Sequence, residues 1–467
     1  SPGREGFFAN NSYTPVESTD HSLAMFGFTP NVVKVQLTFP TNNLIDTLNL
    51  GGSNITEIKV SQYVHGITSI KETGLLIAPA LSAAGIATIS IDQPLHGDRS
   101  ADFNFDGVYD ITATDTSYGD AYANGNSAVF ANLSSLLTAR DNLRQAASDQ
   151  LALKYAIEKT DIDAALAAEI LAEGLDMGDD NINETSTSLV GVSLGSMVGT
   201  VAQGMSEIYE ATNDVFIFDS SALTVGGAQI GPIMGYSETF GPTVKEALVA
   251  TTGFSGGVAD SLGYTTTEAL ILQAASGDTY FTAAQAAVGM TAAQAQAYLG
   301  GTEAQAAAEF QAMIDLGYSG FLSAFINGAQ VVIDSGDSLI WSTKTTTTPT
   351  LATQVIGNGS TNLSDQTVPN DVIDDGFPIS GTLGWLEALD LTQKSTDSFD
   401  ANGLRVYTNY LVGKHTSALD STHEEGVTES ASAAASATSE MQTEIATFLY
   451  SSGTTLAIDD DAGTVIE

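Results

Sequence analysis

Residues 191–195 read Gly-Val-Ser-Leu-Gly, and this stretch is the strongest indication of the fold in the sequence. The strand-forming run Thr187–Val190 precedes it and the small residues Ser196–Thr200 follow it, so Ser193 lies at a predicted strand-to-helix turn. Glycine on both sides suits a turn so sharp that side chains there would clash with their neighbours. The pattern is that of a nucleophile elbow, which exposes the serine oxygen above the sheet edge with a helix N-terminus behind it.

Short runs of β-branched and aliphatic residues recur on both sides of this turn, and several are apolar nearly throughout, as in strands buried on both faces of a sheet. The predicted strands cover residues 32–39, 57–64, 86–91, 187–192, 214–219, 351–356 and 404–412. Residues 132–159 and 429–450 carry apolar residues at helical spacing, the second with Met441, Ile445 and Phe448. This alternation predicts an α/β fold with a mostly parallel central sheet flanked by helices.

An Ala- and Gln-rich segment, residues 222–350, interrupts the alternation. Four Thr-x-x-Glu or Thr-x-x-Gln patterns in it each predict a reciprocally capped helix start, at Thr265, Thr282, Thr291 and Thr302. We expect a helical cap or lid over the serine; the alternative is a helical subdomain with no role at the site. The predicted domains are an N-terminal β segment (1–50), the first part of the core (51–221), the cap (222–350), the second part of the core (351–450) and a tail (451–467).

The chain is strongly acidic, because 56 Asp and Glu against 14 Lys and Arg give a net charge of −42 over 467 residues. Such a charge repels phosphates, which argues against nucleic-acid binding. High salt screens it, so we expect a secreted or surface-exposed bacterial protein from a saline habitat, the alternative being a generally soluble acidic surface. Cysteine is absent, which excludes disulfides and thiol catalysis. No uninterrupted apolar run predicts a transmembrane segment, and we expect any secretion signal to have been removed.

A serine nucleophile needs a base, and the base needs an orienting acid. His415 follows the last long predicted strand among small residues, and Asp365 lies on the loop after predicted strand 351–356. We predict a catalytic triad of Ser193, Asp365 and His415. The weaker candidates are His423 for the base and Asp371, Asp374 and Asp375 for the acid.

The oxyanion that forms during acyl transfer needs two backbone N–H donors. Leu194 supplies one, directly after the serine. The loop after predicted strand 57–64 supplies the other through Ile67, or through Gly66 if the turn begins one residue earlier. His65 in this loop is a rival base, but we expect it to be a packed, hydrogen-bonded part of the loop, and we expect the turn at residues 92–98 to be structural.

Oxygen ligands recur at alternate positions of one loop: Asp102, Asn104, Asp106, Val108 (through its carbonyl) and Asp110. Gly107 stands at the sixth position, as in the first part of a calcium-binding loop, whereas Ala113 takes the place of the bidentate Glu at the twelfth. We predict a structural Ca²⁺ here and no cofactor for catalysis; the alternative is an acidic turn satisfied by water. A looser acidic cluster at residues 176–184 is a weaker candidate.

Five segments together resemble the VolA-type family of bacterial extracellular lipases and lysophospholipases: His65–Thr68, residues 92–97, residues 102–110, Arg140–Gln145 and residues 191–195. The resemblance covers approximately residues 55 to 450. It implies an α/β-hydrolase fold, a triad at Ser193, Asp365 and His415, and secretion or exposure on the cell surface. It also implies cleavage of carboxylic esters of lipids.

We therefore expect a serine carboxylic ester hydrolase that forms an acyl-enzyme on lipid or other acyl-ester substrates, with transient contact at a lipid interface. Three alternatives stay open at this point. A lysophospholipase or phospholipase would share the chemistry, a polyester-degrading hydrolase would need an open cleft, and a non-catalytic binding protein would use the same scaffold without turnover.

Overall fold

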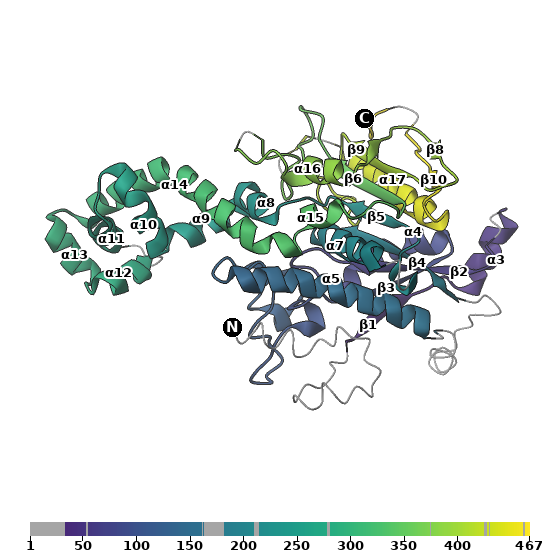
Figure 1. Cartoon of the computed structure of the whole chain (residues 1–467), viewed down its shortest axis with the longest axis horizontal. Coiled ribbons are helices and arrows are strands. Elements are labelled where there is room, and N and C mark those ends of the chain that lie inside the picture. Colours follow the sequence, from purple (N-terminus) through teal and green to yellow (C-terminus); the bar gives the residue numbers. More distant parts are fainter. Residues whose placement is uncertain are drawn as a thin grey trace. The chain divides into compact units, whose positions relative to one another are not determined.

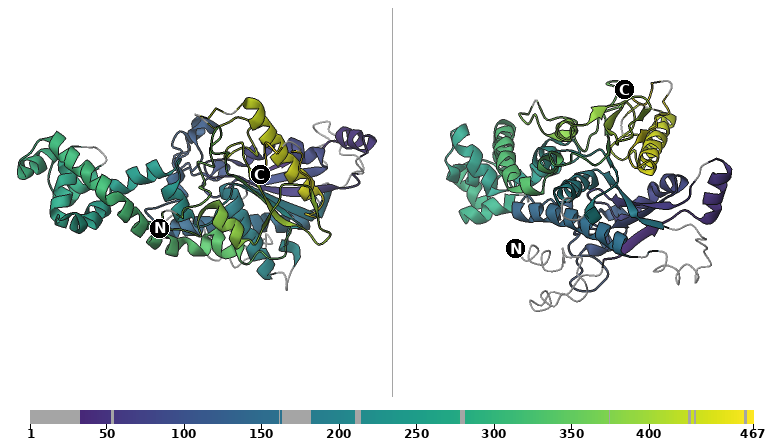
Figure 2. Two further views of the ribbon diagram at one scale, coloured as in Figure 1. Left: turned by 90° about the horizontal axis from the view of Figure 1, so that it is seen from above. Right: turned by 45° about the vertical axis from the view of Figure 1, so that its right-hand side comes forward.

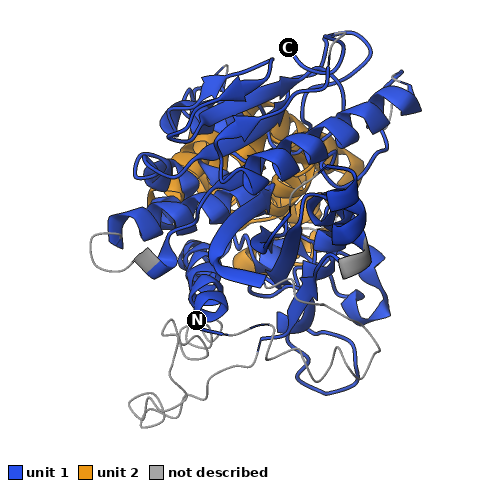
Figure 3. Ribbon diagram, turned by 90° about the vertical axis from the view of Figure 1, so that its right-hand side faces the viewer, with its two compact units in different colours: residues 1–230, 332–467 blue, residues 231–331 orange. Residues whose placement is uncertain are grey.

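The computed structural model describes residues 33–52, 55–160, 162, 182–209, 214–277, 281–373, 375–424, 427–428, 430–460 and 463–467. Most of the predicted N-terminal segment, most of the acidic cluster at 176–184, and Asp374 lie outside the described residues. The chain forms two compact units: residues up to 230 together with 332–467, and residues 231–331 (Figure 3).

An eight-stranded sheet forms the centre of the first unit, in the order β1-β3-β2-β4-β5-β6-β9-β7 (Figure 1). Its strands are β1 (Val35–Thr38), β2 (Ile58–Val64), β3 (Ile86–Ile91), β4 (Ile182–Val192), β5 (Ser221–Thr224), β6 (Thr350–Val355), β7 (Thr392–Gln393) and β9 (Arg405–Tyr410); β8 (Ser398–Phe399) pairs separately with β10 (Thr455–Leu456). β1 runs antiparallel to β3, and the other neighbours pair in parallel. The carboxyl ends of these parallel strands therefore meet at one edge, where the loops that carry the predicted site residues begin.

Helices cover both faces of the sheet (Figure 1, Figure 2). The helices of this unit are α3 (Asn42–Leu50), α4 (Ala78–Ala83), α5 (Leu136–Lys159), α7 (Leu194–Tyr209), α15 (Ser338–Ser342), α16 (Gly381–Ala388) and α17 (Ala431–Tyr450), with short 3₁₀ turns at Lys71–Leu76, Gly97–Arg99, Thr116–Tyr118, Asp120–Tyr122, Ser127–Val129, Asp214–Phe216 and Asp334–Gly336. Ile58 of β2 packs with Ile157 of α5, whereas Tyr63 of the same strand packs in the cluster that holds Met441 and Ile445 of α17. Alternate strand residues thus bury opposite faces, which confirms the predicted α/β layering.

The predicted strand over residues 214–219 is wrong. Residues Asp214–Phe216 form a 3₁₀ turn, and the strand begins later, at Ser221. The side chains of Ser221–Thr224 are fully buried, and the strand pairs in parallel with β4 and β6 on its two sides. The more hydrophobic run before them was the stronger local signal, but pairing with both neighbours decides which residues form the strand.

The second unit is helical, with α8 (Ile230–Tyr236), α9 (Gly241–Val249), α10 (Thr252–Ala259), η7 (Asp260–Leu262), α11 (Thr266–Ala275), α12 (Thr282–Val288), α13 (Ala292–Leu299) and α14 (Glu303–Ile333). Phe254, Phe281 and Phe310 lie in its buried core, and the rings of Phe281 and Phe310 are 4.6 Å apart. Its helical character is therefore as expected for residues within the predicted 222–350 insertion. That it acts as a cap stays a prediction.

Three of the four predicted capping boxes are confirmed. Thr265 with Glu268, Thr291 with Gln294, and Thr302 with Gln305 each exchange the two reciprocal hydrogen bonds. The fourth is wrong, because Thr282 is already the first residue of α12, and its N-cap position belongs to Phe281.

Helix α14 is also the one helix of the described residues that is long and apolar enough to cross a membrane, judged by length and composition over Glu303–Gly336. Only 28% of its most apolar window is buried. Phe310 and Met313 pack in the core of the second unit, while Leu316 and Val331 are 75% and 74% exposed. The prediction of no transmembrane segment considered only uninterrupted apolar runs, and polar residues interrupt this helix.

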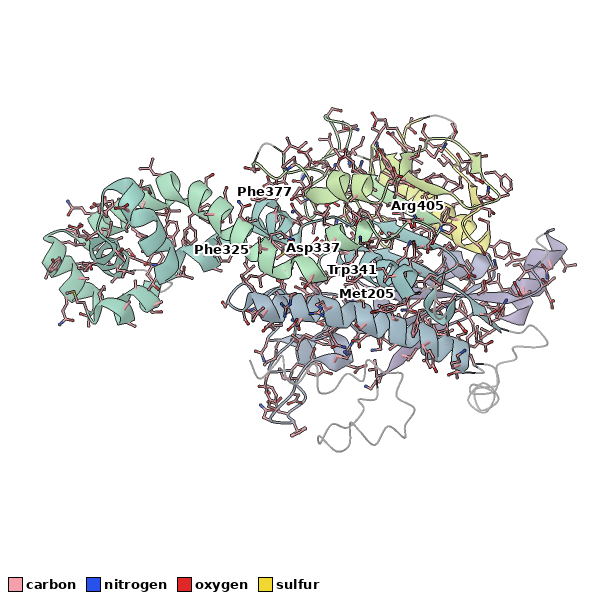
Figure 4. The ribbon with its side chains drawn as sticks, viewed as in Figure 1. Met205, Phe325, Asp337, Trp341, Phe377 and Arg405 are labelled. Carbon is pink, nitrogen blue, oxygen red and sulfur yellow. The ribbon has the colours of Figure 1, made fainter. Side chains whose placement is uncertain are left out.

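Side chains of the first unit fix the two points at which the insertion leaves and rejoins it (Figure 4). Asp337 accepts hydrogen bonds from the N–H groups of Gln229 (3.0 Å) and Ile230 (2.7 Å). The Arg405 guanidinium donates to the carbonyls of Thr345 (2.6 Å) and Thr348 (2.7 Å), just before β6. Asp337 therefore joins the two ends of the insertion to each other, and Arg405 ties its second end to β9.

Candidate active site

Ser193 occupies the turn between β4 and α7 in a strained backbone conformation. Its φ is +59°, a value that residues other than glycine adopt rarely and that clusters at functional sites. Its N–H donates to the carbonyl of Thr224 (3.0 Å), and its own carbonyl accepts from the N–H of Ser196 (2.9 Å) at the start of the helix. The surrounding bonds therefore hold the strained turn, as expected for a nucleophile elbow.

The glycines around this turn are required by space. A Cβ on Gly191 would lie 2.6 Å from the carbonyl oxygen of Gly195, and a Cβ on Gly195 would overlap the carbonyl oxygen of Val64. This confirms the predicted clash at both positions. A Cβ on Gly66 would lie 3.3 Å from the Cβ of Ser193 and 3.8 Å from its Oγ, so the loop after β2 passes directly beside the serine.

Asp365 and His415 form a buried hydrogen-bonded pair. The imidazole Nδ1 lies 2.6 Å from Asp365 Oδ2, and the two residues are 5% and 8% exposed. The other carboxylate oxygen, Oδ1, accepts from the N–H groups of Thr367 (2.8 Å) and Val368 (2.9 Å). One oxygen thus fixes the carboxylate on its loop while the other receives the imidazole Nδ1–H, which leaves Nε2 as the basic nitrogen.

The serine is not hydrogen-bonded to this pair. Nε2 of His415 is buried and has no hydrogen-bond partner within the described part of the chain. The structure therefore joins two of the three predicted triad residues and places Ser193 after β4, at the sheet edge from which the Asp365 and His415 loops also leave. Contacts between a serine and its base are often formed only when substrate is bound.

Two buried histidines tie the loop after β2 to the loop after β3. Nδ1–H of His65 donates to the carbonyl of Gly66 (2.7 Å), and its Nε2 accepts from the N–H of Gln93 (2.9 Å). Nδ1–H of His96 donates to the carbonyl of Pro94 (2.9 Å), and its Nε2 accepts from the N–H of Thr68 (3.2 Å). Backbone groups therefore occupy both nitrogens of both rings.

Burial keeps these two rings neutral, because it lowers the pKa of His65 to about 4 and the pKa of His96 to about 3. Their ring centroids are 5.1 Å apart in an edge-to-face arrangement. The interpretation of His65 as a packed, hydrogen-bonded part of the loop is confirmed. The ring pair instead fixes the loop that holds Ile67, the predicted oxyanion donor beside Ser193.

Lys71 is a part of this region that the sequence did not reveal. Its Nζ lies 2.9 Å from Asp92 Oδ2 and 2.6 Å from Asp98 Oδ2, and its backbone N–H donates to Asp92 Oδ1 (2.8 Å). Burial lowers the pKa of Lys71, but the hydrogen bonds to Asp98, Glu72 and Asp92 together raise it by more than burial lowers it. The pKa of Lys71 therefore lies above its usual value. A single lysine in an acidic chain carries no local pattern that predicts such a buried network. The network supports the expected structural role of the turn at residues 92–98.

The predicted calcium loop folds its side-chain oxygens onto its own backbone. Asp102 accepts from the N–H groups of Phe105 (2.7 Å) and Gly107 (3.0 Å), and Asp110 accepts from that of Phe103 (2.7 Å). The side chain of Asn104 accepts from the N–H of Asp106, and the side chain of Asp106 accepts from the N–H of Val108. Among the described residues, no three His, Cys, Asp or Glu side chains lie close enough together to hold a metal ion. Bound Ca²⁺ therefore stays a prediction that rests on the loop pattern.

No protein-family model matches the chain, and no curated protein sequence matches it. Among solved structures, the chain is similar to an α/β-hydrolase fold protein from Nakamurella multipartita, with 11% identity over 90% of this chain and 96% of that chain and a TM-score of 0.31. It is also similar to a lipase in an open form, with 15% identity over 89% of this chain and 94% of that chain and a TM-score of 0.32. A carboxyl esterase from Bacillus coagulans is 12% identical over 70% of this chain and 76% of that chain, with a TM-score of 0.22.

The protein has the α/β-hydrolase fold. A mostly parallel sheet carries the strained Ser193 after β4, Asp365 after β6 and His415 after β9. Serine, acid and histidine thus follow one another in the chain order of that fold, with a serine turn of the Gly-x-Ser-x-Gly type. The strand order and this turn, rather than the low TM-scores, carry the assignment.

Proposed function

We propose that the protein is a serine hydrolase of carboxylic esters. The observation that supports this most directly is the buried hydrogen bond between Asp365 and His415, at the end of the sheet where Ser193 is held in a strained turn. A fold does not define a function by itself, so the proposal depends on the site. The imidazole of His415 bonds a carboxylate through Nδ1 and has no hydrogen-bond partner at Nε2 among the described residues. A histidine that acts as a general base requires this arrangement.

The proposed reaction has two halves. Ser193 Oγ attacks the ester carbonyl carbon while His415 Nε2 takes its proton, and the negative carboxylate of Asp365 stabilises the imidazolium that forms. The imidazolium then gives this proton to the leaving alkoxide, and the acyl-enzyme remains. Water, deprotonated by His415, attacks the acyl-enzyme; the bond between the acyl carbon and Ser193 Oγ breaks, the imidazolium returns its proton to Oγ, and the carboxylic acid leaves.

The proposed oxyanion donors are the backbone N–H groups of Leu194 and Ile67. Leu194 is the first residue of α7, where helix N–H groups have no acceptor within the helix. Ile67 follows Gly66, whose missing side chain lets the loop approach Ser193. Donors already held in place need no reorganisation as charge develops, and each contributes about 3 kcal/mol in enzymes of this chemistry.

The proposed substrates are lipid or related acyl esters, in line with the resemblance to VolA-type lipases and lysophospholipases. A lysophospholipase or phospholipase and a polyester-degrading hydrolase use the same chemistry. A panel of p-nitrophenyl esters of increasing chain length, lysophosphatidylcholine and a soluble polyester separates these substrates. Faster turnover of lysophosphatidylcholine than of the simple esters would move the assignment to a lysophospholipase.

The proposed chemistry is tested at Ser193. A fluorophosphonate probe should label the wild-type protein, and Ser193→Ala should abolish both labelling and p-nitrophenyl ester hydrolysis without lowering the unfolding temperature. Ser134→Ala, at an exposed serine, is the matched control and should keep both. Turnover that persists in Ser193→Ala, or a wild-type protein that the probe does not label, would favour the non-catalytic binding protein.

We also propose that the protein works outside the cell in a saline habitat. The support is the net charge of −42, whose self-repulsion destabilises the folded state less when salt screens it. The unfolding temperature should therefore rise between low salt and molar NaCl. No rise over this range would contradict the saline setting.

A further inference from the structure

Asn362 connects the loop that carries the acid to the loop that carries the histidine. Its side chain is almost fully buried, at 2% exposure, and its Nδ2 donates to the carbonyls of Leu363 (2.8 Å) and Gly413 (3.0 Å). Leu363 belongs to the acid loop, whereas Gly413 lies two residues before His415. The two loops leave neighbouring strands, so this side chain joins them a second time, beside the hydrogen bond between Asp365 and His415.

The peptide that Asn362 contacts is held from both sides. The carbonyl of Gly413 accepts from Asn362, and the N–H at the other end of the same peptide, that of Lys414, donates to Ser417 Oγ (2.7 Å). Gly413 has a φ of +109°, and a Cβ there would lie 2.7 Å from Ser417 Oγ, so no other residue fits this turn without strain. The next residue after this fixed peptide is His415.

Asn362 itself sits in a rigid turn. Asn358 Oδ1 accepts from the backbone N–H groups of Ser360 (3.0 Å), Thr361 (2.8 Å) and Asn362 (2.9 Å). At the head of this turn Gly357 has a φ of +68°, and a Cβ there would lie 2.5 Å from the carbonyl carbon of Leu363. The donor that reaches Gly413 is therefore placed by fixed backbone rather than by a flexible side chain on an open loop.

We propose that Asn362 is a positioning residue of the active site: by holding the Gly413–Lys414 peptide, it sets the place of the His415 imidazole relative to Asp365. This inference rests on the proposed function for its effect on turnover. Asn362 acts through Gly413, and no role at the substrate is assigned to it. A displacement of about 1 Å between catalytic groups can cost a hundredfold in rate, so a second connection between the two loops has a measurable effect.

The test replaces Asn362 by leucine, which keeps the volume and removes both donors. Asn362→Leu should lower kcat by about tenfold to a hundredfold with little change in KM, because a displaced His415 imidazole impairs proton transfer and not the binding of substrate. Asn370→Leu is the matched control. The Asn370 side chain lies on the same loop and donates to a backbone carbonyl of β6, that of Val355 (2.9 Å), rather than to a carbonyl of the histidine loop.

Proton NMR gives a readout that does not need turnover. The Nδ1–H of His415, bonded to a carboxylate, should give a far-downfield resonance in the wild type and in Asn370→Leu, and a shifted or broadened one in Asn362→Leu. If both variants lose similar stability and both keep the resonance, Asn362 has only a structural role and the inference is wrong. If Asn362→Leu does not fold, Asn362→Ser is measured in its place.

A double-mutant cycle with Asp365→Asn tests the route of the effect. If Asn362 acts through the Asp365–His415 pair, Asn362→Leu should have little further effect on kcat once Asp365 is replaced. If the two residues act independently, the fold-losses in kcat of the two substitutions should multiply. Multiplying effects would overturn the inference. A protein that hydrolyses no ester but loses the downfield resonance in Asn362→Leu would contradict the proposed function and leave the positioning role intact.

Discussion

The loop after β9 and the loops after β2 and β3 each bury histidine, and they use it in opposite ways. His65 and His96 have both ring nitrogens bonded to backbone groups, which leaves no nitrogen for chemistry. His415 has a carboxylate on one nitrogen and no partner on the other. The partners of the two nitrogens therefore separate a histidine that holds a loop from a histidine that can act as a base, although all three are almost equally buried.

The largest effect is expected when the carboxylate bonded to His415 is replaced. Asp365→Asn should lower kcat by about 10⁴-fold, since a neutral amide can donate to Nδ1 and hold the imidazole in the wrong tautomer. The measurement is steady-state hydrolysis of a p-nitrophenyl ester. Asp371→Asn, at an exposed carboxylate of the same loop, should change kcat less than twofold. A loss below tenfold in Asp365→Asn would mean that another group orients His415.

The next largest effect is expected when a histidine that bonds only backbone groups is replaced. His96→Phe keeps a ring in place but leaves the N–H of Thr68 and the carbonyl of Pro94 without their partners. Each of these two unpaired groups costs about 1–3 kcal/mol, so the free energy of unfolding in urea should fall by about 2–6 kcal/mol. His423→Phe, at an exposed position, should change it by less than about 0.5 kcal/mol. Equal losses in the two variants would contradict the role of the ring pair.

The same ring pair predicts a loss of stability in acid. The unfolded chain takes up protons on His65 and His96 near pH 6.5, whereas the folded protein does so only near about 4 and about 3. As the pH falls below 6.5, the free energy of unfolding should therefore decrease by about 1.4 kcal/mol per pH unit for each histidine. Urea titrations between pH 7 and 4.5 measure this slope. His96→Phe lacks one of the two rings, so its slope should be smaller by about 1.4 kcal/mol per pH unit. Parallel slopes in the two proteins would contradict the assignment.

The smallest expected effect concerns the loop at residues 102–110, next to the histidine-tied loops. If it binds Ca²⁺ as its pattern predicts, a hundredfold excess over the dissociation constant should stabilise the fold by about 2.7 kcal/mol, and EDTA should reverse this. Differential scanning calorimetry measures the shift, and Asp102→Ala should abolish it. The same unfolding temperature in Ca²⁺ and in EDTA would favour the acidic turn satisfied by water.

Much of the candidate site could be predicted because its signals are local. The two glycines around Ser193 report the sharpness of one turn, and Asp365 and His415 each follow a strand of clear hydrophobic pattern. The start of β5 could not be predicted, because Ser221–Thr224 form a strand only through their pairing with β4 and β6. Lys71 and Asn362 were missed for the same reason, since their partners lie on other loops.

The sequence by itself determined the α/β class, the serine turn and the candidates for acid and base, because short-range sterics and the spacing of apolar residues act over a few neighbouring positions. The tertiary structure alone decided which histidine meets the carboxylate and which two meet only backbone. It also decided that an asparagine joins the acid loop to the histidine loop. These are contacts between residues tens of positions apart, and only the folded sheet brings the ends of its parallel strands to a common edge.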